Sequence, residues 1–313
     1  MIWFGLITLV LILLMIDILV LHRKGQIITR KKASRETIIW VLVALTFSLV
    51  VYYVYKSNLV HNMNNLSPNQ AVIKYITGYL IELSLSVDNL FVIAMLFTSF
   101  KIPLKHQHKV LFYGILGAII FRAIMIWAGV LLIQKIDWIT YVFGAFLLFT
   151  AIKMLVKEEE NIKPSKFRNF LFKHLKVSES LNEDKFWIIE NGKKMLTPLF
   201  IVLIMIELTD VLFAVDSIPA ILAVTTDPFI VFSSNIFAVL GLRSMYFFLA
   251  DMLERFVYIK YSVIAILVFV SIKLLTIHLF KLPEWFSLSF ITLSLIIGVL
   301  ASLKSKPKKS GLI

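Results

Sequence analysis

Nine apolar runs of about 20 residues or more divide the 313-residue chain and restrict the folds open to it. About 20 helical residues cross the hydrocarbon core of a bilayer, so each run predicts a transmembrane helix. Hydrophobic residues make up 59% of the chain, more than a soluble domain can bury. The sequence therefore predicts an all-α, polytopic membrane helix bundle, with the first run retained as a helix and not cleaved as a signal peptide. The predicted spans are 2–21, 37–56, 72–99, 110–134, 137–156, 195–224, 229–250, 257–280 and 285–303.

The distribution of Lys and Arg predicts how the chain is oriented in the cell membrane. If the basic loop 22–35 is cytoplasmic, the inner loops and tail carry 24 of these residues and the outer segments carry 4. Cytoplasmic loops of membrane proteins are enriched in Lys and Arg. We therefore expect a multi-pass protein with its N-terminus outside and its C-terminus in the cytoplasm. The net charge of +13 is explained by this topology, so it does not indicate nucleic-acid binding.

An internal repeat is indicated by similar segments about 120 residues apart. YVFGAFLLFTAIKML (141–155) and YSVIAILVFVSIKLL (261–275) share seven of fifteen residues, and Arg122 pairs with Arg243 at an offset of 121. Each unit holds three predicted helices, so the two copies would enter the membrane from opposite sides, as in many secondary transporters. The predicted division is 1–70 (two helices), 71–156 (repeat 1), 157–194 (cytoplasmic loop), 195–280 (repeat 2) and 281–313 (last helix and basic tail).

The loop 157–194 is the sizeable soluble segment. Apolar residues at helical spacing in 167–175 predict a short amphipathic helix at the membrane surface. Two short extended runs flank Asn191-Gly192, a dipeptide typical of a β-hairpin turn.

Acidic and polar residues inside two predicted spans are the candidate site. Intramembrane carboxylates are costly, and they usually mark ion pathways. The candidates are Glu82, Asp88 and Asn89 in the third span and Glu207, Asp210, Asp216 and Ser217 in the sixth. Because Asp216 follows Asp210 by six positions, an unbroken helix would turn it away by about 240°. Pro219 predicts a helix break that would bring Asp216 back to the site.

The charges within the spans do not cancel, since five carboxylates face two arginines, Arg122 and Arg243. Each arginine is expected to lie beside an acid of the site, with Lys153 and Lys273 as further compensating charges. The surplus negative charge requires protons or a bound cation. Oxygen ligands in a chain without cysteine suit hard ions such as Mn²⁺, Mg²⁺ or Ca²⁺. The alternative is that these acids form buried ion pairs or protonated contacts between helices. Asp17 in the first span is as suited to such a contact as to a ligand.

Three segments resemble the TerC family of integral membrane proteins, part of the LysE-like exporter superfamily. They are ELSLSVDNLFV, TPLFIVLIMIELTDVLFAVDSIPAIL and SSNIFAVLGLRSMYF, and the resemblance extends from about Tyr75 to Leu275. It implies export of Mn²⁺ from the cytoplasm, with the acidic residues of both motifs taking part. An acidic site would repel the tellurium oxyanion for which the family is named.

Two other classes of function stay open. One is a membrane scaffold or metal-delivery protein for envelope or secretion machinery. The other is an intramembrane aspartyl protease, which is disfavoured because the chain has no GxGD stretch. No nucleotide-binding loop occurs, so an exporter would be driven by an ion gradient, with protons as one candidate. We expect no enzymatic activity and no permanently bound cofactor; the expected partners are Mn²⁺ and the lipid bilayer.

Overall fold

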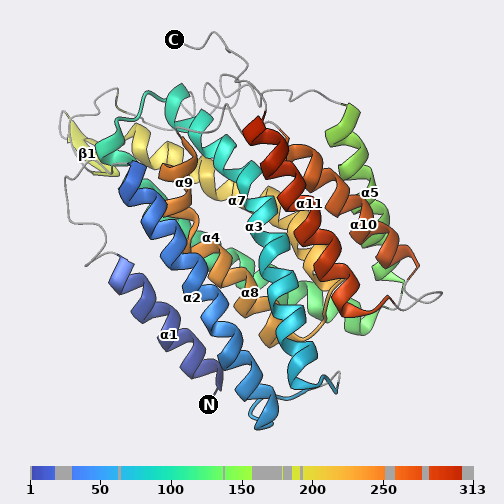
Figure 1. Cartoon of the computed structure of the whole chain (residues 1–313). Coiled ribbons are helices and arrows are strands. Elements are labelled where there is room, and N and C mark those ends of the chain that lie inside the picture. Colours follow the sequence, from blue (N-terminus) through green and yellow to red (C-terminus); the bar gives the residue numbers. More distant parts are fainter. Residues whose placement is uncertain are drawn as a thin grey trace.

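The computed structural model is a bundle of long helices with one small hairpin (Figure 1). It describes residues 2–17, 30–62, 65–136, 138–156, 178, 185–190, 193–250, 258–276 and 282–304. The helices are α1 (Ile2–Ile16), α2 (Arg30–Lys56), α3 (Pro68–Ser99), α4 (Leu104–Lys135), α5 (Ile139–Val156), α7 (Pro198–Leu222), α8 (Pro228–Leu240), α9 (Leu242–Ala250), α10 (Ile259–Leu275) and α11 (Glu284–Lys304). The strands are β1 (Trp187–Glu190) and β2 (Lys193–Leu196). The predicted all-α class is confirmed.

Seven helical segments among the described residues are long and apolar enough to cross a membrane. They are α2, α3, α4, α5, α7, α11 and a segment that joins α8 to α9. The other two predicted spans contain α1, with 15 residues, and α10, with 17. Residues 18–29 and 277–281, which adjoin these two helices, lie outside the described part of the chain. Every predicted span thus coincides with a helix, and the count of nine crossings stays a prediction.

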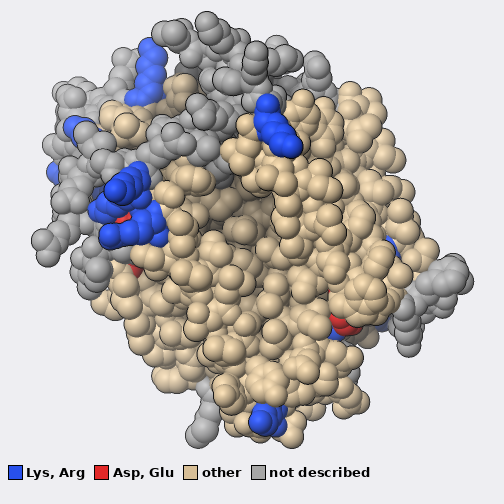
Figure 2. Space-filling view, viewed as in Figure 1, with Lys and Arg blue, Asp and Glu red and all other residues tan. Residues whose placement is uncertain are grey.

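The helices differ in how much of their surface the bundle covers. In α3 and α7, 69% and 50% of the most apolar window is buried, and in the segment of α8 and α9 the share is 83%. In α5 and α11 it is only 17% and 22%. The outer helices point apolar side chains outward, such as Phe4 (77% exposed) and Leu155 (65% exposed). The described surface in Figure 2 is almost entirely uncharged, with Lys and Arg confined to patches near its margins. This is the surface that a lipid environment requires.

Local sequence signals fix where the central helices begin. Ser67 precedes α3 and forms a capping box with Gln70, which satisfies two backbone N–H groups of the first turn. Asp227 precedes α8, and its Oδ1 accepts a hydrogen bond from the backbone N–H of Phe229 at 3.0 Å. Proline occupies the start of α3, α7 and α8, where its missing N–H costs no hydrogen bond.

Helices α3 and α7 run antiparallel and contact each other. Lys74, near the start of α3, donates a hydrogen bond to the carbonyl oxygen of Val224, just beyond the end of α7, at 2.7 Å. Lys74 also forms an ion pair with Glu284 of α11 at 2.8 Å. The predicted repeat relates α3 to α7 and α4 to α8. The packing of α4 on α7 is therefore the counterpart of the packing of α8 on α3, and both contacts are present. The repeat itself stays a prediction.

The expected break in the sixth span is absent. Helix α7 is continuous from Pro198 to Leu222 and includes Pro219. The proline removes the N–H that would bond to the carbonyl of Val215, but it lies only three residues before the helix ends, so the last turn absorbs the loss. An interruption occurs instead in the predicted span 229–250, at Gly241 between α8 and α9.

The predicted hairpin is confirmed. β1 pairs antiparallel with β2, and Glu190 is the register partner of Lys193. The hairpin lies at the end of the bundle from which α7 starts (Figure 1). The predicted amphipathic helix at 167–175 lies outside the described residues.

Candidate functional site

Arg122 of α4 is the centre of a buried polar cluster. The side chain is fully buried, with 1% of the residue exposed. Its Nε and Nη2 donate to the two carboxylate oxygens of Asp210 on α7, at 3.2 and 2.8 Å. Its Nη1 donates to Glu82 Oε1 on α3 and, at 2.9 Å, to Asn235 Oδ1 on α8. The planar guanidinium suits this role because it presents several donors in a fixed fork. One side chain therefore joins four helices.

Two side chains of α3 complete the cluster. Asn89 Nδ2 donates to Asp210 Oδ1 at 3.0 Å, across the contact of α3 with α7. Ser86 Oγ donates to Glu82 Oε1 at 3.4 Å. Asp210 is the central residue of the 25-residue α7, so the cluster lies midway along that helix. The third and sixth predicted spans therefore contact each other near their midpoints.

The cluster carries a surplus negative charge, because two carboxylates share one guanidinium. Both carboxylates are buried, with Glu82 1% and Asp210 3% exposed. A buried charge without compensation is costly, so a site of this kind favours a second cation or a proton. Within the described part of the chain, the buried atoms Glu82 Oε2 and Asn89 Oδ1 have no hydrogen-bond partner. These two oxygens are available to a ligand.

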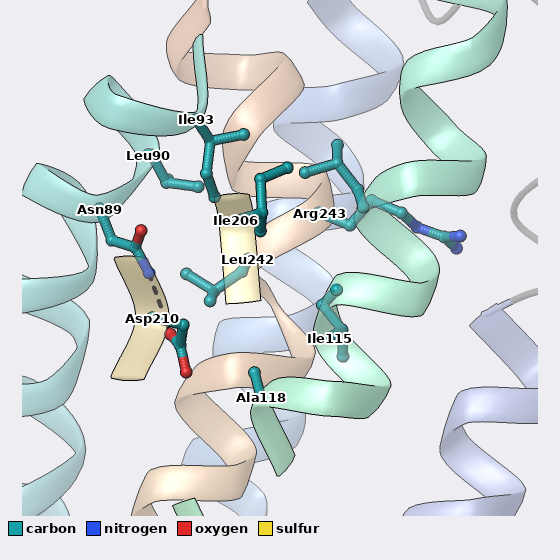
Figure 3. Close-up of a pocket in the computed structure, with 11 residues that line it drawn as sticks. Asn89, Leu90, Ile93, Ile115, Ala118, Ile206, Asp210, Leu242 and Arg243 are labelled. Atoms are coloured by element: carbon teal, nitrogen blue, oxygen red, sulfur yellow. Dashed lines mark hydrogen bonds between the residues drawn. The ribbon is translucent and has the colours of Figure 1, made fainter. Parts of the chain in front are cut away.

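A small cavity lies beside the cluster (Figure 3). The space in which the centre of a water-sized sphere fits is about 20 Å³, enough for one water molecule or a small ion. Asn89 and Asp210 form its polar wall, and the remaining lining is largely apolar, including Leu90, Ile93 and Leu242. The cavity is therefore an ion-sized space bordered by one carboxylate and one amide side chain.

Three other predicted site residues lie outside this cluster. Glu207 is half-buried against Gly117 of α4, where a Cβ would lie 2.0 Å from Glu207 Oε1. Asp216 is half-buried and accepts a hydrogen bond from Thr150 Oγ1 of α5 at 3.1 Å. Ser217 is buried, and its Oγ has no hydrogen-bond partner. Because α7 is unbroken, Asp216 faces α5 instead of the cluster.

The side chain of Asp88 lies outside the described part of the structure. Among the side chains that are described, no three of His, Asp and Glu converge in a group that could hold a metal ion. The cavity is lined by one carboxylate, Asp210, and one amide, Asn89, while Glu82 and Arg122 belong to the adjoining cluster.

Arg122 lies beside two acids of the predicted site, whereas the ion pair described for Arg243 is with Asp17, an acid outside that set. Arg243 binds Asp17, which directly follows α1, through the carboxylate and, at 3.0 Å, the backbone carbonyl. Its guanidinium turns away from the cavity that its stem helps to line (Figure 3). Lys153 is exposed on α5, near Asp216, and Lys273 donates to Ser287 Oγ of α11 at 3.1 Å.

The sequence analysis missed Asn235, Thr150 and the role of Asp17. Asn235 ends the buried polar run Ser233-Ser234-Asn235 in the otherwise apolar α8, and that run was a usable signal. Asp17 was considered, but nothing in the sequence connects it with Arg243, which is 226 positions away.

The described residues thus define an integral membrane protein of the polytopic helix-bundle class, with an acidic cluster buried at its centre. Residues 67–310 match the integral membrane protein TerC family. The chain therefore belongs to the TerC family.

Relatives resemble the chain over almost all of its length. The protein named "Putative membrane-bound redox modulator Alx" in Escherichia coli (strain K12) is 45% identical over 292 residues, which cover 92% of this chain and 90% of the relative. "Uncharacterized membrane protein STKORF319" of Myxococcus xanthus is 43% identical, with 96% of this chain and 91% of the relative covered. An "Uncharacterized membrane protein" of Rickettsia bellii is 40% identical, with 97% of each chain covered. No solved structure matches the chain.

Proposed function

We propose that this protein exports divalent metal ions, with Mn²⁺ as the cargo that leaves the cytoplasm. The observation that carries the proposal is the Glu82–Arg122–Asp210 cluster, which has surplus negative charge and borders an ion-sized cavity. Its place halfway along α7 puts it near the middle of the bilayer, where transporters bind their cargo.

The ligand chemistry supports a hard cation. The polar groups at the cavity include Asp210 and Asn89, Glu82 lies in the adjoining cluster, and the chain has no cysteine to offer a thiolate. Carboxylate and amide oxygens suit Mn²⁺, Mg²⁺ and Ca²⁺. The choice of Mn²⁺ among them follows from the resemblance of the two acidic motifs to those of the family.

In this proposal, Asp216 is a second carboxylate that contacts the cation during transport. It lies six residues beyond Asp210 in α7, about 9 Å along the helix axis. Its carboxylate is half-buried beside Thr150 and near Lys153. A cation that leaves the central cluster toward the end of α7 would meet this carboxylate next.

A second candidate function comes from the name of the Alx relatives, which describes a redox modulator. Thiol exchange cannot be the route in this chain, because its 313 residues include no cysteine. Movement of Mn²⁺, an ion with more than one accessible oxidation state, would alter redox balance without chemistry on the protein itself. A membrane scaffold that transports no metal ion is a third candidate function. The protein is expected not to be an enzyme.

A flux assay in liposomes tests the proposal. The purified protein is reconstituted, and Mn²⁺ entry is followed with an enclosed fluorophore that Mn²⁺ quenches, with and without an imposed pH gradient. We expect flux in the wild type and none in Asp210→Asn. Glu284→Gln is the matched control, because it removes a carboxylate at the end of the bundle, away from the cluster. Wild-type protein that moves no Mn²⁺ would contradict the proposal and favour the scaffold.

A further inference from the structure

A layer of three buried side chains adjoins one end of the cavity. They are Phe97 of α3, Gln107 of α4 and Tyr246 of α9, which are 1%, 7% and 4% exposed. Each lies four positions, or one helical turn of about 6 Å, from a residue that lines the cavity. On these three helices, the lining residues in question are Ile93, Leu111 and Leu242. Tyr246 contacts the other two side chains of the layer, so all three lie on the same side of the cavity.

Tyr246 and Gln107 hold this layer together. The hydroxyl of Tyr246 donates a hydrogen bond to Gln107 Oε1 at 3.0 Å. The ring of Tyr246 packs edge-on against the ring of Phe97, with the centroids 5.5 Å apart. Gln107 Nε2 donates to the carbonyl oxygen of Ile102, in the connection between α3 and α4, at 2.9 Å. One amide therefore ties both α9 and this connection to α4.

The layer lies close to the end of the bundle. Phe97 is the third residue from the end of α3, and Gln107 is the fourth residue of α4. Asn89, at the cavity, lies 10 residues before the end of α3 but 21 residues after its start. The predicted orientation places the nearer end in the cytoplasm, where Lys101 and Lys105 are exposed. The shorter route between the cavity and water therefore runs through this layer, on the side from which an exporter takes its cargo.

We propose that Phe97, Gln107 and Tyr246 form the gate through which the cation enters the cavity, and that the Tyr246–Gln107 hydrogen bond holds this gate shut. The cargo assigned to the gate rests on the proposed function. A constriction built largely from hydrocarbon excludes a hydrated ion while it is closed. Once the hydrogen bond is broken, the hydroxyl oxygen of Tyr246 and the amide oxygen of Gln107 can face the entering ion. Oxygen ligands of this kind replace part of the water shell of a hard cation.

Thiol labelling inside the cavity tests the gate without any metal ion. The chain has no cysteine, so Ile93→Cys places a single thiol at the cavity wall. The reagent is a small cationic methanethiosulfonate that does not cross the bilayer. It is applied to inside-out vesicles, which expose the cytoplasmic face, and to right-side-out vesicles. In the Ile93→Cys background, Tyr246→Phe keeps the aromatic ring and removes only the hydroxyl. We expect it to raise the labelling rate in inside-out vesicles about three- to tenfold, the range for loss of one hydrogen bond.

Tyr75→Phe in the same background is the matched control. Tyr75 is also buried, and its hydroxyl donates to the carbonyl oxygen of Ala44 at the same distance, 3.0 Å. It lies near the opposite end of α3, so its loss should leave the labelling rate unchanged. Gln107→Leu removes the bond to Tyr246 from the other partner and should raise the rate as Tyr246→Phe does. The test therefore does not depend on the folding of one variant.

The outcomes separate the gate from the proposed function. If the wild type transports Mn²⁺ in liposomes but neither Tyr246→Phe nor Gln107→Leu raises the labelling rate, the gate is overturned and the proposed function stands. An equal rise in right-side-out vesicles would show general loosening of the bundle and would also overturn the gate. A wild type that moves no Mn²⁺ would contradict the proposed function and the cargo assigned to the gate.

Discussion

Arg122 compensates two buried carboxylates at once and also binds Asn235. Removing it would leave Glu82 and Asp210 buried with no cation between them. Removing either acid alone would still leave Arg122 one partner. The arginine and its acids should therefore respond differently to substitution, and two predictions at the scale of single residues follow from this difference.

We expect Arg122→Ala to lower the amount of folded protein in the membrane and to abolish Mn²⁺ efflux. Removing one partner of a buried ion pair costs about 3–5 kcal/mol, a large share of the stability of a typical domain. Membrane levels are measured by blot and efflux in cells that lack other exporters. Lys135→Ala, which removes an exposed charge at the end of the same helix, should change neither. Normal accumulation and transport by Arg122→Ala would make the arginine dispensable.

Asp210→Asn and Asp216→Asn should both abolish Mn²⁺ efflux while protein stays in the membrane. They should differ in metal binding. Asp210 borders the cavity, so its amide variant should lose Mn²⁺ binding, whereas Asp216→Asn should bind Mn²⁺ within about threefold of the wild type. Binding to the purified variants and efflux in cells are compared. If well-expressed Asp216→Asn shows Mn²⁺ efflux at the wild-type level, Asp216 is not part of the transport pathway.

At this scale the sequence predicted which residues are buried and charged better than it predicted their partners. Arg122 was expected beside an acid of the site because an unpaired intramembrane arginine is too costly. An unpaired Arg243 would be equally costly, but this cost does not specify which acid must lie beside the guanidinium. Asp17 meets the requirement as well as an acid of the site would. The partner depends on how α1 packs, and a single sequence carries no signal for that.

The elements themselves were predictable because apolar length alone identifies a spanning helix. The hairpin followed from the turn preference of Asn-Gly. The position of the helix break did not follow. Pro219 is a strong helix breaker by local rules, but it stands in the last turn of α7, where few hydrogen bonds remain to be lost. No proline in the sequence marks the interruption at Gly241.

Close packing of α5 on α10 gives a prediction at the scale of elements. A Cβ added at Gly144 would lie 2.9 Å from Leu275 Cγ and 3.1 Å from Leu274 Cβ. The second atom adjoins the backbone and cannot move aside easily. We expect Gly144→Ala to lower the midpoint of thermal unfolding, because overpacking costs about 1–3 kcal/mol against a gain of about 1 kcal/mol in helix propensity.

The matched control for this change is Gly5→Ala in α1. Among the described residues, no atom beyond the adjacent residues and the nearby backbone of α1 lies within 4 Å of a Cβ at Gly5, so alanine there should leave the midpoint unchanged or raise it. Equal midpoints for the two variants would show that α5 and α10 can separate without loss.

For the whole molecule, the predicted orientation can be tested cleanly because the chain contains no native cysteine. Single cysteines are introduced at Ser57 and Lys105, both exposed, at opposite ends of the bundle. A membrane-impermeant maleimide applied to intact cells should label Ser57→Cys. It should label Lys105→Cys only after the membrane is permeabilised. The reverse pattern would place the N-terminus in the cytoplasm.

The four-helix contact of Arg122 also has a consequence for biosynthesis. The ribosome makes Glu82 and Arg122 on the adjacent helices α3 and α4, so Glu82, one of the two acids of α3, can enter the lipid already paired with a base. Helix α7 comes later and brings Glu207, Asp210 and Asp216 with no basic residue of its own. It becomes stable in the lipid once Asp210 meets the arginine that was inserted before it. The order of synthesis therefore makes the first half of the chain a template for insertion of the second.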